Sequence, residues 1–572
     1  MTVPSFDAEI ATDERQQWTV VLQDDREYSV LAQQLCWGYD GRLEDGGSWR
    51  TGTVLAVNED AYAWDPAALW ACCPQGAGYL ITQNRKAQSM APPPQATLLV
   101  GMAKNQYDFI ADERGQPHAV PKTGPRIALP LHGKGPLSKR LMLDFFNKAG
   151  KPPSSNALTG AINVLAAEAE GTERTPVHLR SARLDDGGLA IDMGDAEGRC
   201  VVIRDGEWKV MKHAPEGIVF RRTTLTGAMP RPAKNGNLNL LRKLINISDE
   251  GWDMLRAWLA MALLPDVPVP ILSLTGTQGS GKSSLARAVI GLVDPSPSPL
   301  RTPPKASDEW HTVAAASRVI GLDNISSIQP WFSDLLCRTV TGDGAAKRQL
   351  YTDDEIYVTN FRRAIVLTSI DPGGLRGDLG ERLMPIELGV ISSKQRRAEE
   401  QIDALLQQQM PRILGGLFDL IAQVLANPVE ADELPRMGDA GHIMAAVDKA
   451  LDSDALGAYT NAQDAIAEIV LEGDPVAAAV MRFMAEQDGT EWIGTPTDLF
   501  RALSDKTGDR TAQWPGNSRG LSARLKRMTP AFRDAYKLEV AFSRGKGRRV
   551  RLRYLDGKSR KRSRGRVKAA AQ

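Results

Sequence analysis

The fold is decided by residues Ile271–Ile290, which read ILSLTGTQGSGKSSLARAVI. The loop Gly276–Ser283 within them fits GxxxxGK[ST], a pattern that cradles nucleotide phosphates when it follows a strand and opens a helix. Residues 271–274 are apolar, as in a buried strand, and residues 284–290 have helical spacing. The sequence therefore predicts an α/β core of the P-loop ATPase type.

This interpretation gives ATP and Mg²⁺ as cofactors. Glycines let backbone N–H groups close around the β-phosphate, and the start of a helix adds positive potential. Lys282 is expected to reach the β- and γ-phosphates, and the Ser283 hydroxyl to bind Mg²⁺. The predicted ATP-binding residues are Gly276, Thr277, Gln278, Gly279, Ser280, Gly281, Lys282, Ser283 and Ser284.

A second acidic element follows in residues 317–324, SRVIGLDN. Its largely apolar run ends at Asp323, the predicted Mg²⁺ carboxylate, which would act through water; a strand-end aspartate that begins a turn is the alternative. Asn324 stands where many such ATPases carry Glu. Because an amide can orient water but cannot take its proton, the rate of hydrolysis stays open.

Two further catalytic candidates come later in the chain. The apolar run 364–367 ends at Thr368, which is expected to touch the γ-phosphate or the attacking water from a strand between the first two. An ordinary strand exit is the alternative. Arg382, in DLGERL, could project across a subunit interface onto a neighbour's γ-phosphate. The alternative is a surface arginine paired with Asp378 or Glu381.

These motifs, in this order and within roughly 107 residues, resemble the superfamily 3 helicases of the AAA+ class. More closely, they are similar to the phage and plasmid primase-helicase ATPases. The resemblance rests on Gly276–Ser283, Val319–Ser326, Trp331–Thr341, Arg348–Glu355 and Asp378–Leu383, with flanks at Asn239–Trp258 and Trp514–Arg553. At Thr368 the family more often has Asn.

The resemblance implies a ring, usually a hexamer, whose central channel holds single-stranded DNA. The channel-lining segment maps to Gly342–Tyr357, with Lys347 and Arg348 as the candidate contacts. A solvated β-hairpin is the alternative. Many members of the family carry a primase, but the acid pairs Asp24-Asp25 and Asp185-Asp186 lack the expected strand pattern and downstream His, so priming is not predicted.

The C-terminal region predicts a winged helix-turn-helix that binds duplex DNA. A helix at 497–503 precedes a basic helix at 519–528, and strands at 536–542 and 549–554 form a basic hairpin. A small interaction domain with a solvated basic face is the alternative. The candidate DNA-binding side chains are Arg519, Arg524, Lys526, Arg527, Arg544, Lys546, Arg548 and Arg549.

Composition sets the frame for these motifs. A chain of 572 residues is too long to fold around one hydrophobic core, so several domains are expected. The predicted organisation is an N-terminal α+β domain (1–155), a small β unit (156–235), the ATPase with its helical lead-in (236–394), a helical linker (395–475), the winged helix (476–555) and a basic tail (556–572). From residue 544 onward the charge is about +12, against a net charge of +1 for the whole chain, which suggests a polyanionic partner.

Five cysteines without CxxC spacing, no long apolar run and no basic leader predict a cytoplasmic protein without a membrane span. The resulting hypothesis is an ATP-dependent DNA helicase or replication initiator-helicase of a phage, plasmid or integrated mobile element. It would act as a ring with DNA and possibly other replication proteins. The alternatives are an ATP-switched DNA-binding initiator or helicase loader without motor activity, and a defence or regulatory ATPase.

Overall fold

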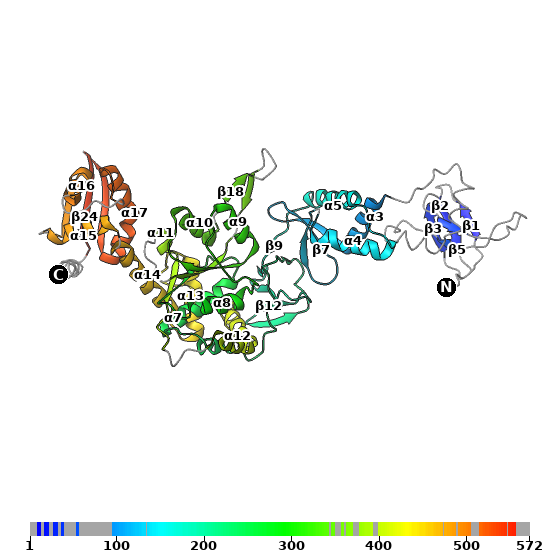
Figure 1. Ribbon diagram of the computed structural model, residues 1–572, viewed down its shortest axis with the longest axis horizontal. Coiled ribbons are helices and arrows are strands. Elements are labelled where there is room, and N and C mark those ends of the chain that lie inside the picture. Colours follow the sequence, from blue (N-terminus) through cyan, green and yellow to red (C-terminus); the bar gives the residue numbers. More distant parts are fainter. Residues whose placement is uncertain are drawn as a thin grey trace, which may run out of the picture. The chain divides into compact units, whose positions relative to one another are not determined.

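The computed structural model describes residues 94–555 with short gaps (Figure 1). The gaps are 133, 343–344, 349–355, 360–361, 370–376, 393–397, 473, 488–489, 505–513 and 546. Before residue 94 it describes only the strands β1 (Glu9–Thr12), β2 (Gln17–Val21), β3 (Glu27–Leu31), β4 (Cys36–Gly38) and β5 (Thr53–Leu55). The predicted basic tail and Asp24-Asp25 lie outside the described residues.

The chain divides into two compact units, Met1–Val177 and His178–Gln572. In the first unit, one core joins residues of three helices, including Leu99, Leu141 and Ile162. The boundary predicted at residue 155 is therefore corrected, because the helix that begins there buries its apolar face in this core. The elements are α3 (Gln95–Gln106), β6 (Tyr107–Ala111), β7 (Pro117–Pro121), β8 (Ile127–Pro130), α4 (Pro136–Ala149), α5 (Ser155–Glu170) and, at the boundary, β9 (Val177–His178).

The second unit begins with an antiparallel sheet. Its strands are β10 (Ser181–Arg183), β11 (Leu189–Asp192), β12 (Cys200–Arg204) and β13 (Glu207–Met211), each paired with the next. The short strand β14 (Val219–Arg221) follows.

A five-stranded parallel sheet forms the centre of the second unit. Its strand order is β16-β17-β20-β15-β21, so β20 lies between β15 and β17, as predicted for the strand that ends at Thr368. Parallel strands bring their carboxyl ends to one edge, where ligands of open α/β sheets bind. The strands are β15 (Ile271–Thr275), β16 (Leu300–Arg301), β17 (Val319–Ile325), β20 (Ala364–Ser369) and β21 (Leu383–Glu387).

Helices cover this sheet, with α9 and α10 on one side of the strands and α8 on the other (Figure 1). They are α6 (Asn239–Arg242), α7 (Asp249–Leu263), α8 (Lys282–Val293), α9 (Ser307–Ala316), α10 (Pro330–Thr341) and α11 (Gly377–Gly380). A two-stranded hairpin, β18 (Ala345–Arg348) and β19 (Ile356–Thr359), extends away from the sheet (Figure 1).

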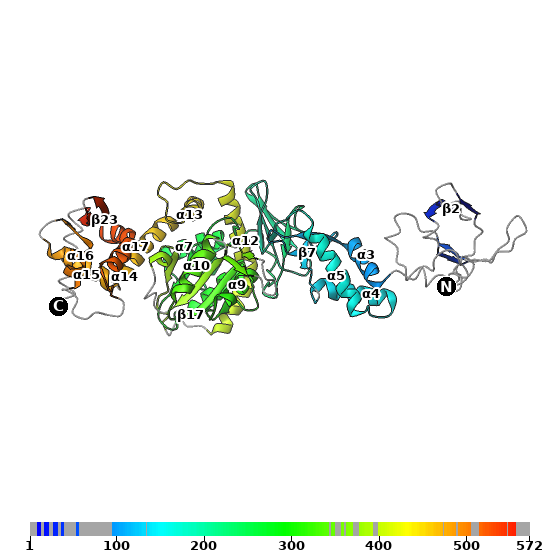
Figure 2. The same cartoon turned by 90° about the horizontal axis from the view of Figure 1, so that it is seen from above.

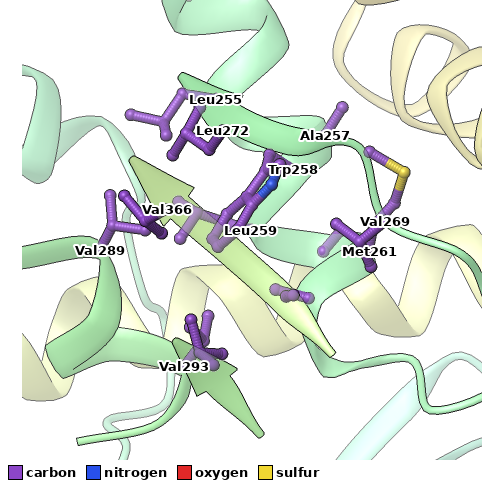
Figure 3. Packing of buried hydrophobic residues seen from close by; sticks show 14 of the residues in the cluster. Leu255, Ala257, Trp258, Leu259, Met261, Val269, Leu272, Val289, Val293 and Val366 are labelled. Atoms are coloured by element: carbon purple, nitrogen blue, oxygen red, sulfur yellow. The ribbon is translucent and has the colours of Figure 1, made fainter. Parts of the chain in front are cut away.

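The core packs α7 and α8 onto the sheet. Figure 3 shows Trp258 of α7 in one cluster with Leu272 of β15, Val366 of β20 and Val289 of α8. Trp258 is fully buried, and its indole N–H donates to the carbonyl of Pro270 at 2.8 Å. A buried indole retains a large apolar contact only when its polar end finds such a partner.

Three helices follow the sheet: α12 (Glu399–Ala426), α13 (Gly438–Leu451) and α14 (Ala455–Glu472). Pro411 stands inside α12, and its carbonyl accepts the N–H of Ala233 at 2.8 Å. At Gly415 an added Cβ would lie 1.9 Å from the carbonyl oxygen of Ala233. The segment before α6 therefore crosses α12 backbone to backbone, which explains glycine in the middle of a helix.

The C-terminal part surrounds its own hydrophobic cluster, with α15, α16 and α17 around an antiparallel sheet of order β22-β24-β23 (Figure 2). The basic helix is longer than predicted: it ends at Tyr536, and Lys537 adopts φ 48° after it. The strand predicted to begin at Tyr536 therefore begins at Leu538. The elements are α15 (Pro475–Glu486), β22 (Glu491–Gly494), α16 (Pro496–Ser504), α17 (Ser518–Tyr536), β23 (Leu538–Gly545) and β24 (Gly547–Tyr554).

Asp294, at the end of α8, joins that helix to the start of β17. Its Oδ2 accepts the backbone N–H groups of Arg318 and Val319 at 2.9 and 3.0 Å. Its Oδ1 accepts from Arg180 Nε at 2.8 Å, in a pair whose side chains are 9% and 1% exposed. A buried carboxylate is tolerated only when its charge and lone pairs are matched in this way.

Arg318 completes the junction from the other direction. Its guanidinium donates to the carbonyls of Ala262, Leu264 and Arg362. Full burial lowers the pKa of Arg318 to about 10, although the negative charge of Asp294 acts to raise it. The backbone at the start of β17 is therefore fixed on both sides.

We predict that Asp294→Ala lowers the free energy of unfolding by about 3–5 kcal/mol, because the change strands a buried arginine and two buried N–H groups. The control is Asp266→Ala. Asp266 bonds Arg183 at 2.9 Å but is 52% exposed, so its loss should cost less than about 1 kcal/mol. Urea unfolding followed by tryptophan fluorescence measures both, and equal costs would contradict the assignment.

Candidate nucleotide site and basic surface

The glycine loop after β15 has the backbone that its sequence predicts. Gly276, Gly279 and Gly281 have φ values of 136°, 78° and 90°, in the region that favours glycine. An added Cβ on Gly276 would lie 2.6 Å from the carbonyl oxygen of Leu388. Only glycine fits there, because the segment after β21 passes directly against the loop.

The end of the loop presents its polar side chains together. Gly281 caps α8, and Lys282 Nζ donates to the carbonyls of Gly276 and Thr277, both at 2.8 Å. The ammonium thus bends back over the loop. Ser280 is buried, and within the described residues its hydroxyl oxygen has no hydrogen-bond partner.

Ser283 and Asp323 meet across the sheet edge. The Ser283 hydroxyl donates to Asp323 Oδ1 at 2.9 Å, so the two predicted Mg²⁺ ligands are in direct contact. Ser283 lies in the first turn of α8, and Asp323 lies on β17. The two residues are 40 positions apart in the chain but neighbours in space. Hydroxyl and carboxylate oxygens are the donors that Mg²⁺ prefers.

Thr368 holds the backbone around Asp323. It donates to Asp323 Oδ1 at 2.5 Å and accepts the backbone N–H of Asn324 at 2.9 Å. The register between β17 and β20 shifts between Leu322 and Ile325, which marks a β-bulge. Asn324 occupies it with φ 57°, a conformation that Asn adopts more readily than most residues.

The sequence predicts that Thr368 touches the γ-phosphate or the attacking water. In the structure its hydroxyl bonds Asp323 and the Asn324 N–H, and Asn324 is exposed at the same edge. The pattern that could have shown this is the pairing of neighbouring strands, since Thr368 and Asp323 end adjacent strands.

Arg382 lies in an ion-pair cluster of its own chain. Its Nη1 donates to Asp378 Oδ1 and to the Asp378 carbonyl, both at 2.7 Å. Burial opposes ionisation of Asp378, but Arg382 and then Arg436 lower the pKa of the carboxyl below its ordinary value. Arg436, which sequence reasoning missed, reaches Asp378 from 58 residues further along the chain.

Lys347 and Arg348 lie on β18, opposite Tyr357 and Ile356 of β19. The segment between the Asp323 strand and the Thr368 strand therefore forms a two-stranded hairpin in the backbone, and its contact with DNA stays a prediction. The side chains of these two basic residues lie outside the described part of the structure.

Five of the candidate DNA-binding residues in the C-terminal part are exposed. They are Arg519, Lys526, Arg527, Arg548 and Arg549. Lys526 also lies 5.0 Å from the centre of the Phe542 ring.

Arg524 does not belong to this surface and is corrected. It pairs with Asp474 at 2.6 Å, and Asp474 caps the start of α15. Asp474-Pro475 carries a helix-start signature, and that signature could have suggested the partner. Lys546 and the Arg544 side chain lie outside the described residues.

The chain matches two protein-family models. The fold is a mixed α/β one, with a parallel sheet whose carboxyl edge gathers the glycine loop, Ser283, Asp323 and Thr368. Residues 238–468 match the model of the actinomycete integrative conjugative element replication protein family. Residues 476–565 match the AICE RepA C-terminal domain. Over more than half of its length, the chain is thus similar to the replication proteins of these mobile elements.

Solved structures were also found. The apo structure of the NrS-1 C-terminal region has 11% identity and a TM-score of 0.33, covering 82% of this chain and 100% of that one. An A-form apo structure of the same region has 11% identity, a TM-score of 0.36 and coverages of 81% and 100%. JCV helicase bound to a phenoxyphenyl acetamide has 12% identity, a TM-score of 0.19 and coverages of 38% and 66%.

No curated protein matches the chain. Among the helices that the structure describes, none combines the length and the apolar character needed to cross a bilayer.

We predict that Thr368→Val, which keeps the shape of the side chain, lowers the free energy of unfolding by about 1–3 kcal/mol, because the Asn324 N–H loses its partner. Thr460→Val is the control, since the exposed Thr460 hydroxyl bonds only the Leu456 carbonyl of its own helix. Chemical denaturation of both variants gives the comparison. A Thr368 variant as stable as the Thr460 variant would show that the bulge does not need this hydroxyl.

Proposed function

We propose that this protein is an ATP- and Mg²⁺-dependent motor that acts on DNA during replication of an integrative conjugative element. The observation that carries the proposal is the convergence of Lys282, Ser283 and Asp323 at the carboxyl edge of the parallel sheet. The match to a replication-protein family supplies the biological setting.

The loop residues fit a bound nucleotide. The glycines give the loop positive φ values, and the Ser280 hydroxyl, which has no partner among the described residues, is a further polar group in the same turn. In this proposal Lys282 leaves the loop carbonyls and pairs with the phosphates. Bound Mg²⁺ would neutralise phosphate charge as it develops during hydrolysis.

Ser283 and Asp323 would hold that ion, and Thr368 keeps the carboxylate oriented toward it. Ligands are effective when their own hydrogen bonds fix their direction. Asn324 would orient the attacking water with its exposed amide.

The strand order supports the AAA+ class, because β20 stands between the loop strand and the Asp323 strand. Proteins of this class that resemble the chain act as rings, usually hexamers. In such a ring the β18–β19 hairpin would face single-stranded DNA with Lys347 and Arg348.

The C-terminal part would bind duplex DNA as a winged helix. Helix α17 exposes Arg519 and Arg527 along one helix, and the β23–β24 hairpin exposes Arg548 and Arg549 next to it. Basic side chains on a helix and on an adjacent hairpin can contact the phosphates on both sides of a groove.

A second candidate function rests on Asn324. Because no carboxylate follows Asp323, the protein could use ATP as a switch for DNA binding, as an initiator or helicase loader, without fast turnover. ATP turnover with and without single-stranded DNA, together with strand separation of a forked duplex, separates the two. DNA-stimulated turnover with strand separation supports the motor, and ATP-dependent DNA binding without either supports the switch.

We predict that Lys282→Ala weakens ATP binding by about ten- to a hundred-fold, the loss expected for one charge-assisted hydrogen bond. Lys305→Ala removes an exposed lysine from the same unit and should bind ATP as the wild type does. Isothermal titration calorimetry with a non-hydrolysable ATP analogue measures both, with circular dichroism to confirm folding. Unchanged affinity in the Lys282 variant would refute the nucleotide site.

We also predict that replacing Arg519 and Arg527 together by Ala weakens DNA binding and lowers the slope of log K against log salt by about 0.9 for each lost phosphate contact on duplex DNA. Arg524→Ala should disturb α15 rather than the slope, because Arg524 is paired with Asp474. Arg482→Ala, an exposed arginine on α15, is the neutral control. Fluorescence anisotropy over a salt series tests this, and an unchanged slope in the double variant would move duplex contact elsewhere.

A further inference from the structure

Asp378 stands at the centre of a cluster that the nucleotide site does not explain. It accepts two bonds from Arg382, at its Oδ1 and at its backbone carbonyl. The Arg382 side chain is only 13% exposed, and its Nε is buried without a hydrogen-bond partner among the described residues. One nitrogen of Arg382 is thus satisfied locally while another is not.

Arg436 binds the same carboxylate from a different element. Its Nη2 lies 2.9 Å from Asp378 Oδ1, and its Nη1 contacts Glu381, the residue before Arg382. Arg436 precedes α13 in the helical segment, whereas Asp378 lies in α11 and Arg382 follows that helix. Two guanidinium groups therefore share one carboxylate oxygen.

This sharing has a consequence if Arg382 acts on the nucleotide of a neighbouring subunit. To reach it, the Arg382 guanidinium, only 13% exposed, must leave Asp378, whose side chain is 57% exposed. A carboxylate this exposed loses little when one cation leaves, and a second cation lowers that cost further. Arg436 already bonds that oxygen, so Asp378 stays paired when Arg382 leaves.

We propose that Arg436 is a positioning residue for Arg382: it anchors Asp378 and Glu381, and it keeps Asp378 paired when Arg382 turns toward the adjoining subunit. The proposal rests on the proposed function, in which Arg382 serves hydrolysis in trans. A merely structural ion pair, with Arg436 47% exposed, would contribute little to folding and nothing specific to turnover.

The test compares Arg436→Ala, Arg436→Lys and Arg204→Ala in the full chain. Arg204 is matched in exposure, at 48%, and pairs with Asp186 at 3.2 Å far from the nucleotide loop in sequence. We expect Arg436→Ala to lower kcat for ATP about ten-fold with KM within about two-fold, equivalent to about 1.4 kcal/mol of transition-state stabilisation. Arg436→Lys should recover part of kcat, and Arg204→Ala should match the wild type.

Mixing separates a trans effect from a local one. Arg436→Ala subunits mixed with Lys282→Ala subunits should regain turnover, because each supplies what its neighbour lacks, and Arg382→Ala should behave in the same way. Arg436→Ala should lower kcat by less in the Asp378→Asn background than in the wild-type protein, because the shared carboxylate is already absent.

The outcomes distinguish the two proposals. Normal kcat in Arg436→Ala with a low kcat in Arg382→Ala overturns the role of Arg436 and leaves the proposed function standing. A raised KM with unchanged kcat also overturns it. Wild-type protein that neither binds nor hydrolyses ATP overturns the proposed function itself.

Discussion

The carboxylate of Asp294 is the constraint on which the site depends. It joins the end of α8 to the N–H groups of Arg318 and Val319, where β17 begins, and the glycine loop and Asp323 lie at the opposite ends of those two elements. A shift of either element along its axis would separate Ser283 from Asp323. Arg180 adds the antiparallel sheet to the same junction, because its guanidinium also donates to the Asp192 carbonyl. One buried charge thus sets the register of the helix against the strand.

Much of the central fold could be predicted from the sequence, and the reason is local. The backbone of the loop could be predicted from its glycines, because Gly276 and Gly281 have positive φ values that other residues rarely adopt. The order of the motifs also allowed the strand ending at Thr368 to be placed between its neighbours, and the sheet has that order.

What could not be predicted depends on side chains that meet across long stretches of chain. Arg524 looked like part of a basic surface because nothing near it in sequence is acidic, yet Asp474 lies 50 residues before it. Arg436 and Asp378 are joined in the same way. The packing of α5 in the first core and the extension of α17 to Tyr536 depend on tertiary contacts and capping that the local apolar pattern does not show.

The crossing of α12 by the segment before α6 makes one mechanical body of pieces far apart in the chain. The backbone of Ala233 rests on Pro411 and Gly415, and Trp208 of the antiparallel sheet donates to Asp419 one turn further along α12 at 2.7 Å. The two backbones are in direct contact at Gly415. The helix therefore cannot slide past this crossing without a steric clash. A tilt of α12 would therefore carry the antiparallel sheet with it, because the two are joined at this crossing and at the Trp208–Asp419 bond.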